Sequence, residues 1–313
     1  MSAPRPNVFS GPYVDRRSQA RKDAERVAEA LADPAALLVP VWRHRSLVRS
    51  LPEPKAVLLS GQHAIRAYLE DEALIYLGEF RGRATFAVDL HEQALEAHAA
   101  QQSPTLEEAA EFADLRSVGG LLPSDEAGLL AYARALIYWR SKHRHCGACG
   151  QPTHPRDAGH VMACVAEGCG HQSFPRIDPA IIVLITDGER ALLGRQAVWP
   201  KGRYSTLAGF VEPGESLEDA VIREMQEEAG ILVTDIRYHS SQPWPFPSSL
   251  MLGFTARAVN TDIALNDAEL EDARWFTRDD IAAGVVGLPP PTSVSFRLIE
   301  HWLGAVTPPA PAR

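Results

Sequence analysis

The sequence contains no apolar run of the roughly 20 residues needed to cross a bilayer. The longest early apolar run, residues 35–41, is interrupted by Pro40 and lies too far from the start to act as a signal peptide. The first residues are polar and carry scattered arginines such as Arg5 and Arg16. We therefore expect no membrane association and a cytoplasmic protein.

The sequence has fewer basic than acidic residues, with 31 Lys and Arg against 40 Asp and Glu, and its net charge is −9. Such a balance argues against nonspecific binding to a polyanion, although a local basic channel would be compatible with it. At 313 residues the chain is long for one domain, so two or more units are expected. Its 45% hydrophobic residues suffice for ordinary cores.

Cysteine is also scarce. The sequence has only four cysteines, namely Cys146, Cys149, Cys164 and Cys169. Two disulfides would suit a secreted protein, but the lack of a signal peptide favours a metal site. Each cysteine pair forms a short turn with glycine behind it, and four thiolates complete the tetrahedral shell of a structural zinc ion. We predict a zinc ribbon over residues 141–176.

The remaining pattern predicts an α+β protein in three parts: an N-terminal α+β domain (residues 1–140), the zinc ribbon (141–176) and a C-terminal domain (177–313). In the first part, residues 73–76 and 84–88 predict a hairpin, and residues 105–115 and 124–142 predict helices. In the last part, residues 181–186, 190–193, 205–207, 234–239 and 250–258 predict strands, and residues 294–303 predict a helix.

The most informative segment is residues 209–231. Ser216 and Asp219 form a capping-box pattern and Gly230 is a typical stop, which predicts a helix over residues 217–229. One stripe of this helix begins apolar and ends with Glu224, Glu227 and Glu228. Three carboxylates crowded on a protein-facing stripe would repel one another, so Mg²⁺ or Mn²⁺ is expected among them. A solvated acidic face is the alternative.

The same segment resembles the Nudix box, G-x5-E-x7-R-E-U-x-E-E-x-G-U, where U is a bulky apolar residue. The matching positions are Gly209, Glu215, Arg223, Glu224, Met225, Glu227, Glu228, Gly230 and Ile231. The resemblance implies a hydrolase of diphosphates linked to another moiety, folded as an α/β/α sandwich with a mixed sheet. It also implies that Glu224 and Glu228 hold divalent metal, that Glu227 joins them or positions water, and that Arg223 and Glu215 form a structural ion pair.

A proline-aromatic segment follows at residues 241–249. Stiff proline backbone can present flat rings to a base or nicotinamide, whereas the alternative is that Trp244 simply packs on the core. The segment resembles the signature of the NADH pyrophosphatase subfamily of Nudix enzymes, which also carries a four-cysteine ribbon. That resemblance implies hydrolysis of NADH or NAD to nicotinamide mononucleotide and AMP, removal of NAD caps from RNA 5′ ends, and a homodimer that requires Mg²⁺ or Mn²⁺.

The resemblance extends to individual positions. It implies metal ligands at the carbonyl of Ala208 and at Glu224, Glu228 and Glu269, whereas Asp272 stands where the longer Glu is common. It implies that Phe210 and the partner's Phe174 sandwich the nicotinamide, and that Arg116 binds substrate. The substrate pocket would be lined by Gln242, Pro243, Trp244, Pro245, Phe246, Pro247, Ser248 and Ser249.

Two other functions are compatible with these motifs. A Nudix hydrolase of ADP-ribose or of an oxidised nucleoside triphosphate would make the 242–249 segment incidental. A nucleic-acid-binding protein would use the zinc ribbon and keep the Nudix unit as scaffold, but the acidic set and the negative net charge weigh against it.

Overall fold

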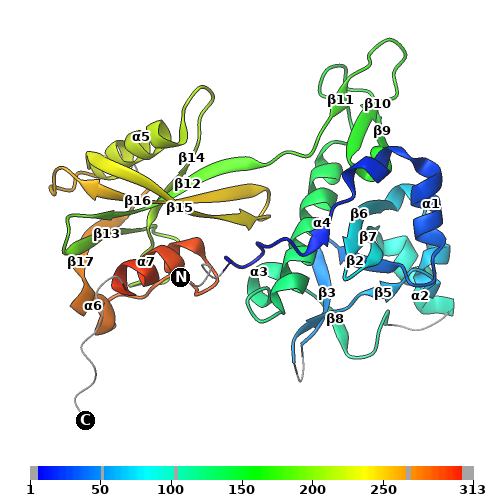
Figure 1. Ribbon diagram of the computed structural model, residues 1–313, viewed down its shortest axis with the longest axis horizontal. Helices are drawn as coiled ribbons and strands as arrows, with labels where there is room; N and C mark the ends of the chain where they lie inside the picture. Colours follow the sequence, from blue (N-terminus) through cyan, green and yellow to red (C-terminus); the bar gives the residue numbers. More distant parts are fainter. Residues whose placement is uncertain (1–5, 51–52, 102–104, 266–268, 305–313) are drawn as a thin grey trace. The chain divides into compact units, whose positions relative to one another are not determined.

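The computed structural model describes residues 6–50, 53–101, 105–265 and 269–304. Contacts between Cα atoms divide the chain into two compact units, each with its own sheet (Figure 1). Among the described residues, the N-terminal unit contains those of Val8–Ile177 and Trp244–Ser248, and the C-terminal unit contains Pro6, Asn7, Asp178–Pro243 and those of 249–304. The three-part division at residues 140 and 176 stays a prediction.

The C-terminal unit is built on a six-stranded sheet of order β15-β16-β12-β13-β17, with β14 also paired to β12. The central strand β12 (Asp178–Thr186) runs parallel to β16 and antiparallel to β13 and β14, so the sheet is mixed. The other strands are β13 (Arg190–Arg195), β14 (Leu207–Phe210), β15 (Val233–Trp244), β16 (Ser249–Ala258) and β17 (Asp272–Thr277).

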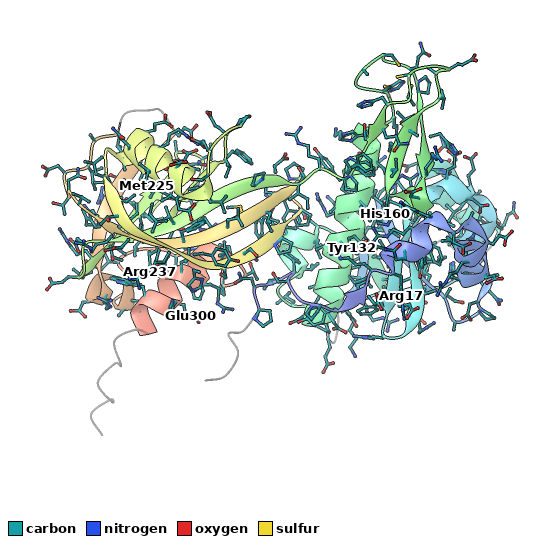
Figure 2. The ribbon with its side chains drawn as sticks, turned by 45° about the horizontal axis from the view of Figure 1, so that its top comes forward. Arg17, Tyr132, His160, Met225, Arg237 and Glu300 are labelled. Carbon is teal, nitrogen blue, oxygen red and sulfur yellow. The ribbon has the colours of Figure 1, made fainter. Side chains whose placement is uncertain are left out.

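Helices cover both faces of this sheet, because alternate side chains of a strand point to opposite sides. On one face, Ile181 and Val183 pack with Met225 of α5 (Leu217–Ala229), which is labelled in Figure 2. On the other face, Ile182 and Leu184 pack with α6 (Arg278–Ala282) and α7 (Val294–Gly304). The α/β/α sandwich with a mixed sheet is therefore confirmed.

The helix predicted over residues 217–229 is confirmed at both ends. Ser216 and Asp219 form a complete capping box, and Gly230 closes the helix with a φ of 66°. A left-handed φ of this kind favours glycine, so the stop depends on the residue type. The predicted strand at 205–207 is displaced, because β14 begins at Leu207 and Ser205 makes only an isolated bridge to Gly194.

The N-terminal unit contains an eight-stranded sheet of order β1-β6-β7-β2-β3-β4, with β5 on β2 and β8 on β3. Its strands are β1 (Val14–Asp15), β2 (Leu37–Trp42), β3 (Arg45–Arg49), β4 (Lys55–Ala56), β5 (Leu59–Ser60), β6 (Leu74–Phe80), β7 (Arg83–Leu90) and β8 (Ala110–Ala113). Its helices are η1 (Ser18–Lys22), α1 (Ala24–Ala32), η2 (Ala64–Tyr68), η3 (Asp71–Ala73), α2 (Glu92–Gln101), α3 (Leu115–Val118) and α4 (Ser124–Lys142).

The two sheets share one topology. In the N-terminal unit β2 pairs antiparallel with β3 and β5 and parallel with β7, as β12 does with β13, β14 and β16. The strand pairs β6–β7 and β3–β8 likewise correspond to β15–β16 and β13–β17. Where the 13-residue helix α5 follows β14, however, only the short 3-10 helices η2 and η3 follow β5; η2 carries no carboxylate, and η3 is only three residues long. The N-terminal unit therefore repeats the sheet without the acidic helix.

The hairpin β6–β7 and the helix α4 confirm two predictions for this unit, but the helix predicted over residues 105–115 is wrong. There β8 pairs with β3, with Phe112 opposite Leu47, and α3 begins only at Leu115. Pairing with a distant strand outweighs the local helical pattern, which sequence spacing does not reveal.

The ribbon belongs to the N-terminal unit and contains β9 (Thr153–Arg156), η4 (Asp157–Gly159), β10 (Val161–Cys164) and β11 (Gln172–Ser173). Buried His160 donates from Nε2 to the carbonyl of Tyr76 in β6 at 2.8 Å, and its ring lies 6.4 Å from that of Tyr132 in α4 (Figure 2). These contacts join the ribbon to the sheet. Within the described residues, no helix has both the length and the apolar character that a membrane span needs.

Candidate metal-dependent active site

The three glutamates of α5 have different surroundings. Glu228 is only 4% exposed, Glu224 is half-buried, and Glu227 is exposed. Glu224 and Glu228, four residues apart, thus lie on the protein-facing side of the helix. The expectation that all three carboxylates share this side is wrong for Glu227, which turns outward to Arg223 at 3.0 Å.

Glu224 lies directly against β14 at Gly209. A Cβ atom at this glycine would stand 1.9 Å from Cδ of Glu224 and 2.0 Å from Oε1. A side chain at this position would displace the Glu224 carboxylate, so glycine is what permits its close approach to the strand. The neighbouring residue of β14, Ala208, pairs with Ile182 of β12 and thus lies at the same edge of the site.

Arg223 organises the outer side of the acidic set. Its Nε and Nη2 donate to the two carboxylate oxygens of Glu215 at 2.5 and 3.0 Å, which confirms the predicted ion pair. Nη2 also donates to the carbonyl of Phe210 at 2.9 Å, and Nη1 lies 2.9 Å from Glu224. The hydrogen bond from Arg223 lowers the pKa of Glu215 to about 2, and the same bond raises the pKa of Arg223. Both groups are therefore charged at neutral pH.

The electrostatics of Glu224 favour a bound cation. Burial raises the pKa of Glu224, Arg223 opposes this, and the negative charges of Glu227 and Glu269 raise it further. Glu269, in the segment before β17, is thus within electrostatic range of Glu224. A divalent cation would relieve this repulsion, and a donor set made only of oxygens suits Mg²⁺ or Mn²⁺.

The carboxylate oxygens of the acidic set do not form a compact group of three or more within the described residues. In the described ranges, the four cysteines are the only group of three or more candidate ligand atoms within 4.8 Å of one another. Asp272 is engaged elsewhere, because it accepts a hydrogen bond from the Tyr204 hydroxyl and lies 2.6 Å from Arg274. Asp272, which stands where the longer Glu is common, therefore directs its carboxylate to Tyr204 and Arg274.

The proline-aromatic segment is mostly strand. Residues 241–244 continue β15 and Ser249 begins β16, so the predicted extended loop over 241–249 is wrong in its extent. Gln242 is 1% exposed, donates to the carbonyl of Thr292 at 2.7 Å and accepts from the N–H of Val294 at 2.8 Å. These bonds hold the start of α7 and favour a structural role for Gln242. Pro243, beside it, is half-buried at the end of the same strand.

Trp244 to Ser248, with Pro245, Phe246 and Pro247 between them, belong to the N-terminal unit. The rings of Trp244 and Phe246 meet Phe9 edge to face, with centroids 6.2 and 5.7 Å away. Both rings pack against the core of that unit, as the alternative interpretation of Trp244 expected. The guanidinium groups of Arg116 and Arg134 lie 5.0 and 4.8 Å from the centroid of Phe246.

Sequence reasoning missed Arg134. Its side chain donates to the carbonyls of Pro245 and His44, which fixes the turn and brings a cation to the aromatic cluster. Burial lowers the pKa of Arg134, and nearby Arg116 lowers it further. Nothing in the local pattern of residues 124–142 distinguishes this arginine from one facing solvent, because its partners come from distant segments.

The two phenylalanines proposed to stack on nicotinamide are both exposed. Phe174 is 62% exposed in the N-terminal unit and Phe210 is 61% exposed in the C-terminal unit. Both ring faces are therefore available for stacking in the single chain.

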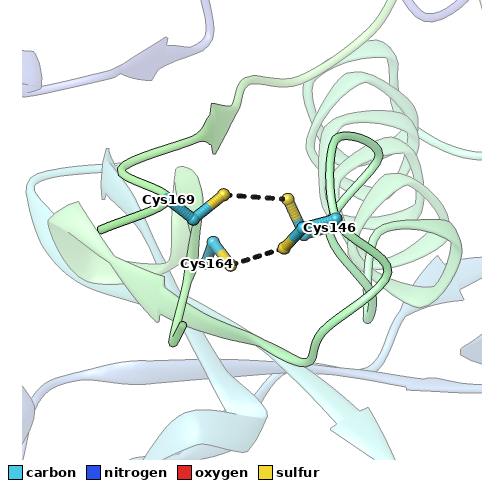
Figure 3. Close-up of side chains that lie close together, drawn as sticks. Cys146, Cys164 and Cys169 are labelled. Carbon is cyan, nitrogen blue, oxygen red and sulfur yellow. Dashed lines mark hydrogen bonds between the residues drawn. The ribbon is translucent and has the colours of Figure 1, made fainter. Parts of the chain in front are cut away.

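The four cysteines are free and come together in the ribbon. Figure 3 shows the sulfurs of Cys146, Cys164 and Cys169 converging from two loops, and the pairs Cys146–Cys169 and Cys149–Cys164 are 3.8 and 3.4 Å apart. Sulfurs at Zn–S distances of about 2.3 Å in a tetrahedron would be similarly spaced. Burial opposes ionisation of Cys146, but the N–H groups of Ala148 and Cys149 lower its pKa to about 6. The cluster therefore fits structural zinc.

An acidic helix on an α/β/α sandwich with a mixed sheet is the arrangement of a metal-dependent diphosphate hydrolase. Comparison with known families agrees along most of the chain. The NUDIX domain matches residues 176–294, the NADH pyrophosphatase-like rudimentary NUDIX domain residues 35–139, and the NADH pyrophosphatase zinc ribbon domain residues 141–174.

Individual relatives extend this result. The chain is 39% identical over 304 residues to the NAD-capped RNA hydrolase NudC of Mycobacterium bovis (strain BCG / Pasteur 1173P2), covering 92% of each chain. It is 43% identical over 197 residues to the NAD-capped RNA hydrolase NUDT12 of Macaca fascicularis, covering 58% of this chain but 43% of that protein. The chain thus spans less than half the length of that relative. It belongs to the Nudix hydrolase family, with the ribbon and rudimentary domain described for NADH pyrophosphatases.

Proposed function

We propose that the chain hydrolyses the central pyrophosphate of NADH or NAD, releasing nicotinamide mononucleotide and AMP, and removes NAD caps from RNA 5′ ends. The observation that carries the proposal is the intact Nudix motif, folded so that Gly209 admits Glu224 and Arg223 anchors Glu215. The names of the NudC and NUDT12 relatives support the choice of substrate. A cytoplasmic location remains part of this proposal.

The residues that would hold Mg²⁺ or Mn²⁺ are Glu224, Glu228, Glu269 and the carbonyl of Ala208. When bound, such ions neutralise pyrophosphate oxygens and lower the pKa of a coordinated water. The chain itself keeps Glu224 against the strand, and buries Glu228 below it. Arg223 pairs with Oε2 of the exposed carboxylate of Glu227, and the other oxygen of that carboxylate would orient the attacking water and accept its proton.

Substrate recognition would rest on aromatic and cationic groups. Phe210 and the partner's Phe174 would stack on nicotinamide in a homodimer, using rings that are exposed in the single chain. Arg116 would supply positive charge toward the substrate phosphates, beside the ring of Phe246. The remaining segment, from Pro243 to Ser249, would shape the pocket wall.

Product analysis tests this function. The full chain is incubated with NADH, NAD⁺, ADP-ribose and NAD-capped RNA at matched concentrations of Mg²⁺ or Mn²⁺, and products are separated by chromatography. The proposal predicts AMP and nicotinamide mononucleotide from NADH, and a 5′-monophosphate from capped RNA, with both lost in Glu224→Gln. Preferred cleavage of ADP-ribose with NADH intact would instead support the alternative Nudix substrate.

Subunit mixing tests the shared site. Phe174→Ala subunits are combined with Glu228→Gln subunits, and verified heterodimers are assayed for NADH hydrolysis. In a shared site one of the two sites carries both lesions and the other carries neither, so activity should recover above that of either parent. No recovery would refute a contribution from the partner's Phe174.

A further inference from the structure

Glu269 does not lie on a helix or strand, so its position depends on what holds the segment after it. Leu270 is buried and closely packed on Gly194 of β13, where a Cβ atom would stand only 3.1 Å from Cδ1 of the leucine. Asp272 begins β17 opposite Arg195, the last residue of β13. The end of β13 is therefore the support for this segment.

Arg195 contacts the segment of residues 269–272 through two bonds to Glu271. Its carbonyl accepts from the N–H of Glu271 at 2.9 Å, and its Nη1 forms an ion pair with the carboxylate of the same residue. Arg195 also contacts the loop that follows β13, because its Nη2 donates to the carbonyl of Trp199 at 3.1 Å. Arg195 is only 8% exposed, so its buried positive charge needs a compensating negative charge. Glu271, which is half exposed at the surface, supplies that charge.

Glu269 lies two residues before Glu271, and its neighbour Leu270 belongs to the same hydrophobic core as Val221 and Met225 of α5, the helix that carries Glu224. A shift of the 270–272 segment would therefore change the distance between two proposed ligands. Nudix family motifs do not include Arg195 among the matched positions, and it touches none of the α5 glutamates in the contacts found among the described residues. The segment that carries Glu269 therefore links Arg195 to the site.

We propose that Arg195, through its ion pair with Glu271, is a positioning residue that holds Glu269 beside Glu224 for divalent metal binding. The inference rests on the proposed function, because it requires Glu269 to be a metal ligand. Groups that orient a ligand from outside the coordination shell commonly change metal affinity when removed.

The test measures Mn²⁺ binding to the zinc-loaded full chain by isothermal titration calorimetry. Arg195→Gln and Glu271→Gln are each expected to weaken Mn²⁺ binding by about tenfold. Arg195→Lys should recover part of the loss, because it keeps the charge. Glu271→Gln removes the same ion pair by changing a half-exposed residue, so it provides the test if Arg195→Gln fails to fold. Arg257→Gln is the matched control, since it removes an exposed ion pair with Asp235 in the same sheet and should bind Mn²⁺ like the wild type.

A double-mutant cycle separates positioning from general damage. If Arg195 acts through Glu269, then Arg195→Gln should cause no further loss of Mn²⁺ affinity in a Glu269→Gln background. An equal loss in both backgrounds would overturn the inference, as would wild-type binding in both Arg195→Gln and Glu271→Gln. If those variants bind normally while Glu269→Gln binds weakly, only this inference fails. If Glu269→Gln itself binds Mn²⁺ normally, the ligand assignment in the proposed function fails, and the inference falls with it.

Discussion

Replacing Gly209 by alanine adds one methyl group at the closest contact between β14 and α5. The new Cβ would lie 1.9 Å from Cδ of Glu224 and 2.0 and 2.4 Å from its two carboxylate oxygens. Comfortable contacts between such atoms begin at about 3.5 Å. Either Glu224 must rotate away or the strand must move from the helix.

Both responses have estimable costs. Rotation would break the 2.9 Å contact between Glu224 and Arg223, and an off-rotamer side chain adds about 1 kcal/mol. Strand movement in a packed core costs about 1 to 3 kcal/mol. The free energy of unfolding should therefore fall by only about 1 to 3 kcal/mol. Displacing the carboxylate of Glu224, which we propose as a metal ligand, by about 1 Å can, however, lower catalysis about 100-fold.

The matched control is Gly304→Ala, which adds the same methyl group in α7 of the same unit, with no atom of the described residues within 4 Å of the new Cβ. NADH hydrolysis is measured as AMP released over a range of Mn²⁺ concentrations, and urea unfolding is measured in parallel. Gly209→Ala should lose most of its kcat/KM while staying folded, and Gly304→Ala should match the wild type. Equal turnover by the two alanine variants would show that the position of Glu224 against β14 has no role in the reaction.

Three further predictions concern the metal sites and pH. Glu228→Gln should fold like the wild type and lose about 100-fold in NADH hydrolysis, because a neutral amide replaces a buried carboxylate that we propose as a metal ligand; turnover retained at saturating Mn²⁺ would contradict this. Cys146→Ser should lose zinc, measured by mass spectrometry, and melt at lower temperature, whereas His171→Ala should keep zinc; a zinc-loaded serine variant with unchanged melting would rule out the structural role. Burial lowers the pKa of His160 from 6.5 to about 4, so its neutral form stabilises the fold above pH 6.5 and this contribution disappears as the pH falls toward 4. Between pH 7 and 4.5 the wild type should lose about 2 to 3 kcal/mol more unfolding free energy than His160→Gln, which can still donate to Tyr76, and parallel pH curves would refute the assignment.

The parts of this molecule that sequence predicts well are those whose causes are local. Helix α5 is an example, because the Ser216 cap, the Gly230 stop and the spacing of Glu224 and Glu228 all lie within one segment. The close approach of Glu224 to Gly209 is signalled only by the family motif, since nothing local distinguishes that glycine from one in a turn.

The parts that sequence reasoning missed depend on distant partners. Residues 110–113 form a strand because β3 is available to pair with them. Gln242 is buried because its side-chain oxygen accepts from the N–H of Val294, the first residue of α7. Arg134 and Arg195 resemble ordinary surface arginines in the sequence, and their roles follow from carbonyl and carboxylate partners brought by other segments. The spacing of apolar residues along the sequence does not predict carbonyl or carboxylate partners that come from distant segments.

The short segment Trp244–Ser248 also matters for the order in which the protein is made. It belongs to the N-terminal unit although it is encoded after helix α5, and Trp244 and Phe246 cover part of the core that includes Phe9. During synthesis the ribosome releases residues in order, so Val8–Ile177 can pair their strands long before this cover emerges. A fragment ending near residue 177 should thus expose the face that Trp244 and Phe246 normally cover. The first unit to be translated is therefore completed only after Asp178–Pro243 of the second unit have been made.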